Sequence, residues 1–312
     1  MSQRMTLAIL ASAAIASCGG GGSSAGEAST GTPAAATAGT AGVLCDYATS
    51  VFNASPSVNA TATARWSCSG TRRTLSANGL PDHAVGTFPN PNNPNTITAQ
   101  SVSASDPLAP QYAGTVTAMN GPNTGAYILN GVKMDPNTAG SCDNSGTSCS
   151  LIGNSGNWSI EALGQSSFNF GVDANNAHVQ PGGTYHYHGM PEGFVAKLGK
   201  GQAMTLVGWA PDGFPVYARY GHAVAGDAGS AIKVMVSSCR LKSAPDAGRP
   251  ATSLYAMGTF RQDYEYVAGL GDLDECNGRT GVTPEFPNGI YHYYATDTYP
   301  YLQRCIKGVV SP

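Results

Sequence analysis

The chain has 312 residues and a formal net charge of −3 at pH 7; only 11% of its residues are charged, and it contains 40 glycines and 20 prolines. This composition suits many short strands joined by turns and argues against a helical bundle. The lack of a basic excess argues against nucleic acid as a partner.

The first 17 residues have the features of an export signal. Arg4 precedes an apolar run over residues 5–16, which is too short to cross a bilayer. The run ends at Ile15-Ala16-Ser17-Cys18, which resembles a lipobox, the site at which bacterial lipoproteins are cleaved and lipidated. We therefore expect residues 1–17 to be a lipoprotein signal peptide and Cys18 to carry the lipid. An ordinary secretory signal with a chance cysteine is the alternative.

Residues 18–42 are expected to form a flexible tether, because Gly and Ser are followed by a low-complexity stretch rich in Ala, Thr and Gly. Since glycine rather than aspartate follows Cys18, lipoprotein-sorting rules imply an outer-membrane anchor in a host that has one. We therefore expect a cell-envelope protein that faces the periplasm or the cell surface and is bound to the membrane through its lipid. Residues 43–312 would then form the folded part.

Seven of the eight cysteines lie in this folded part, and an exported protein is expected to form disulfides. Proximity in the sequence suggests three pairs, although spacing does not determine connectivity: Cys142–Cys149, Cys45–Cys68 and Cys276–Cys305. Cys239 is left over and is expected to be either buried or free. No Cys-x-x-Cys spacing occurs, which argues against a cysteine-ligated zinc site.

The folded part has the sequence pattern of a β protein. Apolar residues alternate loosely over 158–172, which predicts a half-buried strand. A Pro-Gly-Gly turn precedes the run 184–188, a Pro-Asp-Gly turn separates the runs 204–209 and 214–220 as in a hairpin, and residues 232–236 predict another strand. We expect a mainly β single domain, a sandwich or jelly roll with long Gly- and Pro-rich loops.

One turn-and-strand pattern occurs twice. Residues 181–188 (PGGTYHYH) and 287–294 (PNGIYHYY) share the pattern Pro-x-Gly-x-Tyr-His-Tyr. Histidine is scarce, with six in the chain, and two of these, His186 and His292, take the same place in the pattern. We expect two equivalent strands that face one another.

These histidines are candidate metal ligands. Side chains alternate along a strand, so His186 and His188 share one face and can close on a single ion. His292 is the expected third ligand, and His178 and His83 are further candidates. Three imidazoles and an open position are typical of catalytic metal sites, and copper or zinc is the expected metal. The competing interpretation is an amphipathic strand whose histidines hydrogen-bond within a loop-rich core.

Two short segments resemble the metal motifs of cupins. Residues 186–192 resemble the first and residues 281–292 the second, which would make the ligands His186, His188, Glu192 and His292. Two positions depart from the motifs, because Gln180 replaces a glycine and Thr296 replaces an asparagine. The gap between the segments is also longer than in cupins, so the similarity suggests only a type of ligand geometry.

A broader resemblance is to the YHYH domain family. Its signature resembles Tyr185-His186-Tyr187-His188, and further similar segments in the same order extend the resemblance over 77–305, namely NGLPDH (78–83), GWAPDGFPVY (208–217), LDECNG (273–278) and GIYHYY (289–294). The resemblance implies a secreted or surface-associated protein, and the family has no established activity that would assign catalytic residues.

Two functions of different classes stay open. The first is a metalloprotein, with or without catalysis, whose His-rich strands bind a transition metal. The second is a non-catalytic surface module that binds a glycan or another envelope protein through a face formed by some of the fifteen tyrosines.

Overall fold

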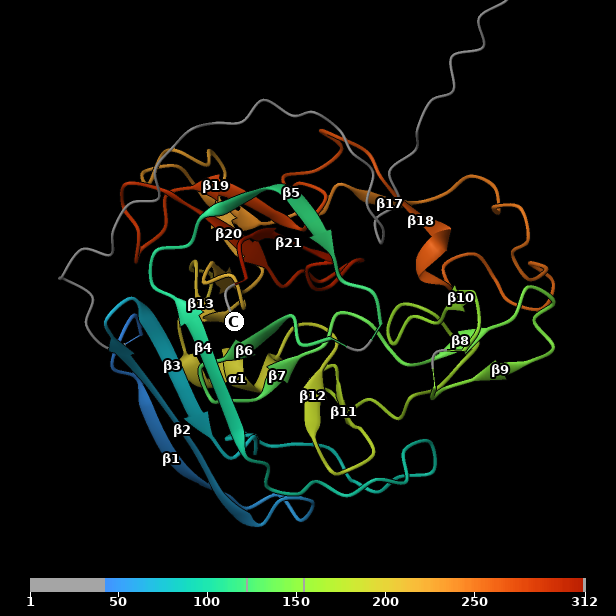
Figure 1. Cartoon of the computed structure of the whole chain (residues 1–312), viewed down its shortest axis with the longest axis horizontal. Coiled ribbons are helices and arrows are strands. Elements are labelled where there is room, and N and C mark those ends of the chain that lie inside the picture. Colours follow the sequence, from blue (N-terminus) through green and yellow to red (C-terminus); the bar gives the residue numbers. More distant parts are fainter. Residues whose placement is uncertain (1–42, 122, 154, 311–312) are drawn as a thin grey trace, which may run out of the picture.

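The computed structural model describes residues 43–121, 123–153 and 155–310 (Figure 1). The expected signal peptide, Cys18 and the tether lie outside these residues, so those expectations stay predictions. Within the described part the chain is mainly β, with one α-helix and one 3-10 helix, which confirms the expected fold class. No helix found there has the length and apolar character needed to cross a membrane.

The N-terminal region forms a four-stranded antiparallel sheet at one side of the molecule, drawn in blue to teal in Figure 1. Its strands pair in sequence order: β1 (Ala48–Asn53), β2 (Ala60–Ser69), β3 (Arg72–Ala77) and β4 (Val102–Pro107). Along β2 every second side chain is buried, ending at Trp66. The indole Nε1 of Trp66 donates a 3.0 Å hydrogen bond to the Leu129 carbonyl and ties this sheet to the next one.

The central sheet has eight strands in the order β11-β12-β7-β6-β13-β14-β20-β19. The strands are β6 (Ala126–Ile128), β7 (Lys133–Met134), β11 (Ala177–Val179), β12 (Tyr185–Tyr187), β13 (Leu206–Trp209), β14 (Pro215–Tyr217), β19 (Gly278–Gly281) and β20 (Ile290–Tyr294). The pairs β12–β7 and β14–β20 are parallel and the others antiparallel. Every residue of β12, β13, β14 and β20 is buried, as expected of strands covered on both faces.

Smaller elements surround the central sheet. Three two-stranded sheets pair β5 (Tyr112–Ala118) with β21 (Cys305–Gly308), β15 (Tyr220–His222) with β16 (Ile232–Val234), and β17 (Cys239–Leu241) with β18 (Tyr264–Tyr266). A three-stranded sheet at the side opposite β1–β4 contains β8 (Ser141–Cys142), β9 (Cys149–Ser150) and β10 (Trp158–Ser159). The helices are α1 (Glu192–Leu198) and the 3-10 helix η1 (Arg261–Asp263).

Several local predictions can be compared with these elements. The hairpin around the Pro-Asp-Gly turn is confirmed as β13–β14, and the strand predicted over 232–236 is confirmed as β16. The strand predicted over 158–172 is wrong in extent, since only Trp158–Ser159 is a strand. The apolar residues later in this segment lie in irregular chain. They belong to, or pack against, a small core cluster that contains Phe170 and Phe260.

All three expected disulfides are confirmed: Cys45–Cys68, Cys142–Cys149 and Cys276–Cys305. Cys239 is half-buried, and no cysteine among the described residues is free. The expectation that Cys239 is either buried or a free thiol is therefore wrong.

The two Tyr-His-Tyr strands are equivalent, but they do not face one another. They are β12 and β20, which lie next to the two opposite edges of the same sheet and are separated by β7, β6, β13 and β14. Each strand pairs in parallel with one hairpin strand and in antiparallel with an edge strand. This arrangement decides which histidines can meet.

Candidate metal centre

Strand pairing places three histidines on one face of the sheet. His186 lies on β12, and His188 directly follows this strand. The two histidines are two residues apart and therefore share a face. His178 on β11 is directly opposite His186 in the antiparallel register, and opposite residues of an antiparallel pair point to the same side. We call these three residues the His triad.

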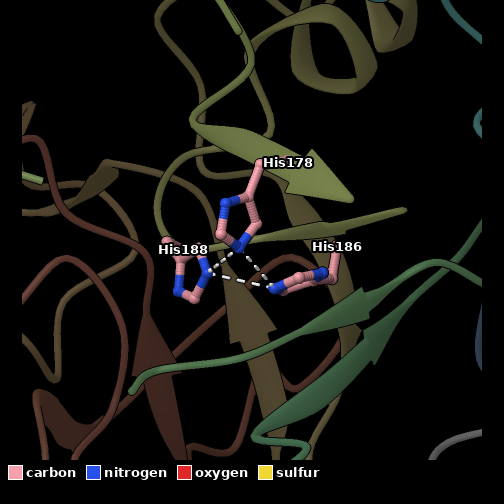
Figure 2. Close-up of side chains that lie close together, drawn as sticks. All are labelled: His178, His186 and His188. Atoms are coloured by element: carbon pink, nitrogen blue, oxygen red, sulfur yellow. Dashed lines mark hydrogen bonds between the residues drawn. The ribbon is translucent and has the colours of Figure 1, made fainter. Parts of the chain in front are cut away.

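The ring nitrogens of the His triad converge on one point (Figure 2). The Nε2 atoms of His178 and His186 are 3.1 Å apart, and Nε2 of His188 lies 3.0 Å from each of them. The exposed fractions of His186 and His188 are 3% and 4%, and His178 is half-buried. The three side chains form a group that could hold a metal ion.

The backbone around the triad fixes where its protons lie. Nδ1 of His178 is 2.9 Å from the carbonyl oxygen of Phe170, and Nδ1 of His186 is 3.2 Å from that of Thr184. A carbonyl oxygen only accepts hydrogen bonds, so in the neutral rings both Nδ1 atoms carry the hydrogen and both Nε2 atoms carry a lone pair. The contact between these two Nε2 atoms therefore brings two lone pairs together.

His188 can supply at most one proton to the triangle of Nε2 atoms while it is neutral. In the described part of the chain its Nδ1 makes no hydrogen bond, although the backbone of Asp135 lies close to it. One Nε2–H cannot form linear hydrogen bonds to both neighbouring lone pairs. The neutral triad therefore leaves at least one buried nitrogen lone pair unsatisfied, which is unfavourable.

Additional protons do not resolve this conflict. Burial lowers the pKa of all three imidazoles, and it holds the pKa of His186 and His188 well below the ordinary value. His188 and His178 lower the pKa of His186 further, and His178 lowers that of His188, because two protonated rings would repel. Three convergent, unprotonated imidazole nitrogens are a donor set that transition metals accept.

A buried carboxylate adjoins the triad. Asp135, which follows β7 and is 1% exposed, has its Oδ2 3.8 Å from Nε2 of His186 and 2.7 Å from Nζ of Lys133. Its Oδ1 has no hydrogen-bond partner among the described residues. Sequence reasoning missed Asp135, because no motif contains it and only the parallel pairing of β7 with β12 brings it here.

The structure does not bring the other predicted ligands to this group. His292 lies on β20, where its Nε2 contacts the Tyr294 hydroxyl at 3.0 Å. Glu192 begins α1 and forms an ion pair with Arg219, so the cupin-like ligand set is not assembled. His83 contacts the hydroxyl of Tyr187 at 2.6 Å, and successive side chains of β12 point to opposite faces, so this contact lies on the face opposite His186. The third imidazole is therefore that of His178.

The tyrosines of both strands lie in the core. Tyr185, Tyr187, Tyr293 and Tyr294 are 0% exposed and Tyr291 is 4% exposed. These tyrosines are therefore not available to a glycan or a protein, whereas the surface-module interpretation requires an exposed tyrosine face. A surface hollow of about 270 Å³ lies elsewhere and contains no candidate ligand, being lined by Gly164, Gln165, Ser166, Ala256, Met257 and Thr259.

Comparison with known proteins identifies the family. The family model described as YHYH protein matches residues 103–308, which include the entire His triad. No curated protein and no solved structure matches the chain. Since the matched segment is well over half of the 312 residues, the chain belongs to the YHYH protein family.

Proposed function

We propose that this protein binds one transition-metal ion, zinc or copper, through Nε2 of His178, His186 and His188. The observation that carries the proposal is the convergence of these three nitrogens at 3.0–3.1 Å while backbone carbonyls direct two lone pairs to the centre. A cation there would satisfy all three lone pairs at once. Metal-bound imidazoles commonly place their other ring nitrogen against a carbonyl in this way.

The size of the triangle also suits such an ion. Tetrahedral zinc with Zn–N bonds of about 2.0–2.1 Å needs nitrogens about 3.3–3.4 Å apart, so the three rings would move apart by a few tenths of an ångström. Asp135 would either supply a fourth ligand or accept a hydrogen bond from one, because its Oδ1 is buried and has no partner among the residues that the structure describes. No reaction is assigned to the site.

The location that accompanies this proposal is the cell envelope. The lipobox-like segment ending at Cys18 supports an outer-membrane lipid anchor, and the three disulfides suit an oxidising compartment. The protein would therefore meet metal ions and any envelope partner outside the cytoplasm.

The first test is elemental analysis of the full chain, exported and purified without a metal-binding tag. We expect about one zinc or copper ion per chain, and loss of the ion in the H186A/H188A double variant. H292A is the matched control, because it removes the histidine at the equivalent place of β20 and should leave the metal content unchanged. A wild-type protein that stays metal-free after zinc and copper are added separately would overturn the proposal.

A further inference from the structure

The central sheet consists of two halves with the same plan. One half has the order β11-β12-β7-β6 and the other the order β19-β20-β14-β13, and the halves meet at the antiparallel pair β6–β13. From the centre of the sheet outward, each half consists of an antiparallel hairpin, then a Tyr-His-Tyr strand that pairs with it in parallel, and then an antiparallel edge strand. The repeated sequence pattern is thus part of a longer structural repeat.

The hairpin turns of the two halves match in detail. Asn130 Oδ1 accepts a hydrogen bond from the amide two residues later at 3.0 Å, and Asp212 Oδ1 does the same at 3.2 Å. The next residues, Gly131 and Gly213, have φ angles of +83° and +85°. Such left-handed angles favour glycine. The same side chains also interact with the Tyr-His-Tyr strands, Asn130 with Tyr187 and Asp212 with Tyr293.

The turns that enter the edge strands match as well. The amides of Asp173 and Asp274 both donate 2.8 Å hydrogen bonds to the carbonyl four residues later. Three residues after each aspartate stands an asparagine with a left-handed φ of 56° or 60°. The hydroxyl of Tyr185 donates to Asp173 at 2.8 Å, and that of Tyr291 donates to Asp274 at 3.2 Å.

This correspondence assigns a counterpart to each member of the His triad. His178 is opposite His186 across β11–β12, as Arg279 is opposite His292 across β19–β20. The position two residues after each strand histidine holds His188 in one half and Tyr294 in the other. The second half therefore has arginine, histidine and tyrosine where the first has three histidines.

The second half satisfies its imidazole without a metal. Nδ1 of His292 donates to the Ile290 carbonyl at 2.9 Å, so its Nε2 is the acceptor of the 3.0 Å hydrogen bond from the Tyr294 hydroxyl. Arg279 Nη2 lies 3.5 Å from that hydroxyl oxygen and 2.7 Å from the His222 carbonyl. A hydroxyl donor and a fixed cation thus stand where the triad has imidazoles.

We infer that the second half is a counterpart of the metal centre that binds no ion, because Arg279 and Tyr294 take the places of two ligands, and that replacing both with histidine creates a second transition-metal site. The inference rests on the proposed function for the nature of the ion. It goes beyond that function because it identifies β19–β20 as the place where two substitutions create a second metal site.

The test compares the zinc and copper content of the full-length wild type with that of R279H/Y294H after dialysis against each metal. We expect about one ion per wild-type chain and about two per variant chain. Adding H186A/H188A to this variant should leave about one ion, now bound by the second half. A folded R279H/Y294H protein with no additional ion would overturn the inference, whereas a metal-free wild type would overturn the proposed function.

The reciprocal exchange tests the inference even where R279H/Y294H fails to fold. H178R/H188Y gives the first half the side chains of the second, so it should fold without metal, with the circular dichroism spectrum of the wild type and no bound ion. Unfolding of H178R/H188Y, or retention of its metal, would show that the two halves are not interchangeable and would overturn the inference.

Discussion

The role of Asp135 in the metal centre can be measured directly. Its carboxylate is buried and lies 3.8 Å from Nε2 of His186, and no group in the described ranges hydrogen-bonds to its Oδ1. We expect Asp135→Asn to weaken zinc binding by about 10- to 100-fold, the usual effect of losing a supporting group around a metal. Competition with a chromophoric chelator would measure the change.

The matched control for Asp135 is Asp173. It accepts a hydrogen bond from Tyr185, whose side chain points to the opposite face of β12 from His186. Since its charge reaches only His178 among the three ligands, Asp173→Asn should change the zinc affinity much less than Asp135→Asn does. Equal affinities for wild type and Asp135→Asn would exclude the carboxylate from the site.

His292 should make stability depend on pH, because burial lowers its pKa to about 3. Between about pH 6.5 and pH 3 the unfolded chain binds a proton at this residue that the folded chain does not, so the contribution of His292 to stability is lost as the pH falls. The free energy of unfolding of His292→Gln should vary less steeply than that of the wild type, by about 1.4 kcal/mol per pH unit. Urea titrations at several pH values would measure both slopes, and parallel curves would contradict the prediction.

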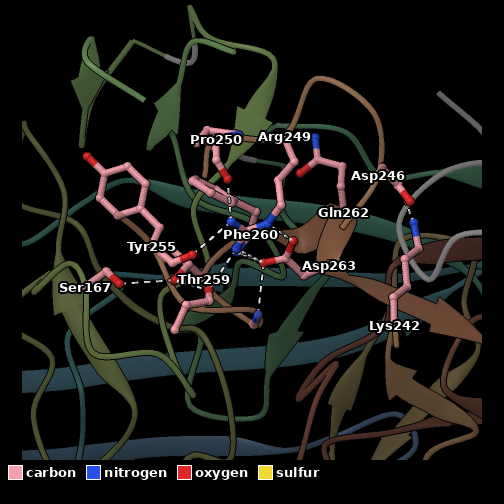
Figure 3. A network of polar contacts seen from close by, with 12 residues as sticks. Ser167, Lys242, Asp246, Arg249, Pro250, Tyr255, Thr259, Phe260, Gln262 and Asp263 are labelled. Carbon is pink, nitrogen blue, oxygen red and sulfur yellow. Dashed lines mark hydrogen bonds and ion pairs between the residues drawn. The ribbon is translucent and has the colours of Figure 1, made fainter. Parts of the chain in front are cut away.

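Among the elements, η1 depends on a buried ion pair (Figure 3). The side chains of Arg249 and Asp263 are 0% and 1% exposed, and two guanidinium nitrogens contact the carboxylate at 2.6 and 2.8 Å. The amides of Gly258 and Phe260 also donate to Asp263. Removing one partner leaves an uncompensated buried charge, so Arg249→Met should lower the free energy of unfolding by about 3–5 kcal/mol.

A neighbouring ion pair provides the control for η1. Arg240 and Glu265 pair across β17–β18, but the arginine side chain is 57% exposed. Arg240→Met should therefore lower the free energy of unfolding by no more than about 1 kcal/mol. Denaturant titrations of both variants test the contrast, and similar losses would show that burial of the Arg249 pair has no special effect.

The elements that sequence reasoning predicted well are those that short-range chemistry specifies. The β13–β14 hairpin follows from a Pro-Asp-Gly turn between β-prone runs. The shared face of His186 and His188 follows from strand alternation. The contribution of His178 depends on which strand pairs with β12, and that of Asp135 depends on a parallel pairing between segments about fifty residues apart. Local pattern does not specify such pairings, so the repeated motif favours His292 over His178 as the third ligand.

At the scale of the whole molecule, composition predicted a mainly β single domain, and the repeated Tyr-His-Tyr pattern predicted two equivalent strands. The pattern did not reveal that the repeat extends to both hairpins and edge strands, because only the turn residues and the strand core are similar in sequence. It also suggested that equivalent residues would meet. In the sheet they occupy corresponding places in separate halves, so each half forms its own polar cluster.

Metal binding should therefore stabilise the whole fold through the first half of the sheet. The triad joins β11 to β12, and β12 pairs with β7, whose hairpin meets the second half at β6–β13. An ion that binds only the folded chain stabilises it by about 2.7 kcal/mol at a free concentration 100 times the Kd. Adding zinc to metal-free protein should raise its thermal midpoint, leave that of H186A/H188A unchanged, and raise that of H292A as much as the wild type. An equal rise in H186A/H188A would mean that zinc stabilises the fold at another place.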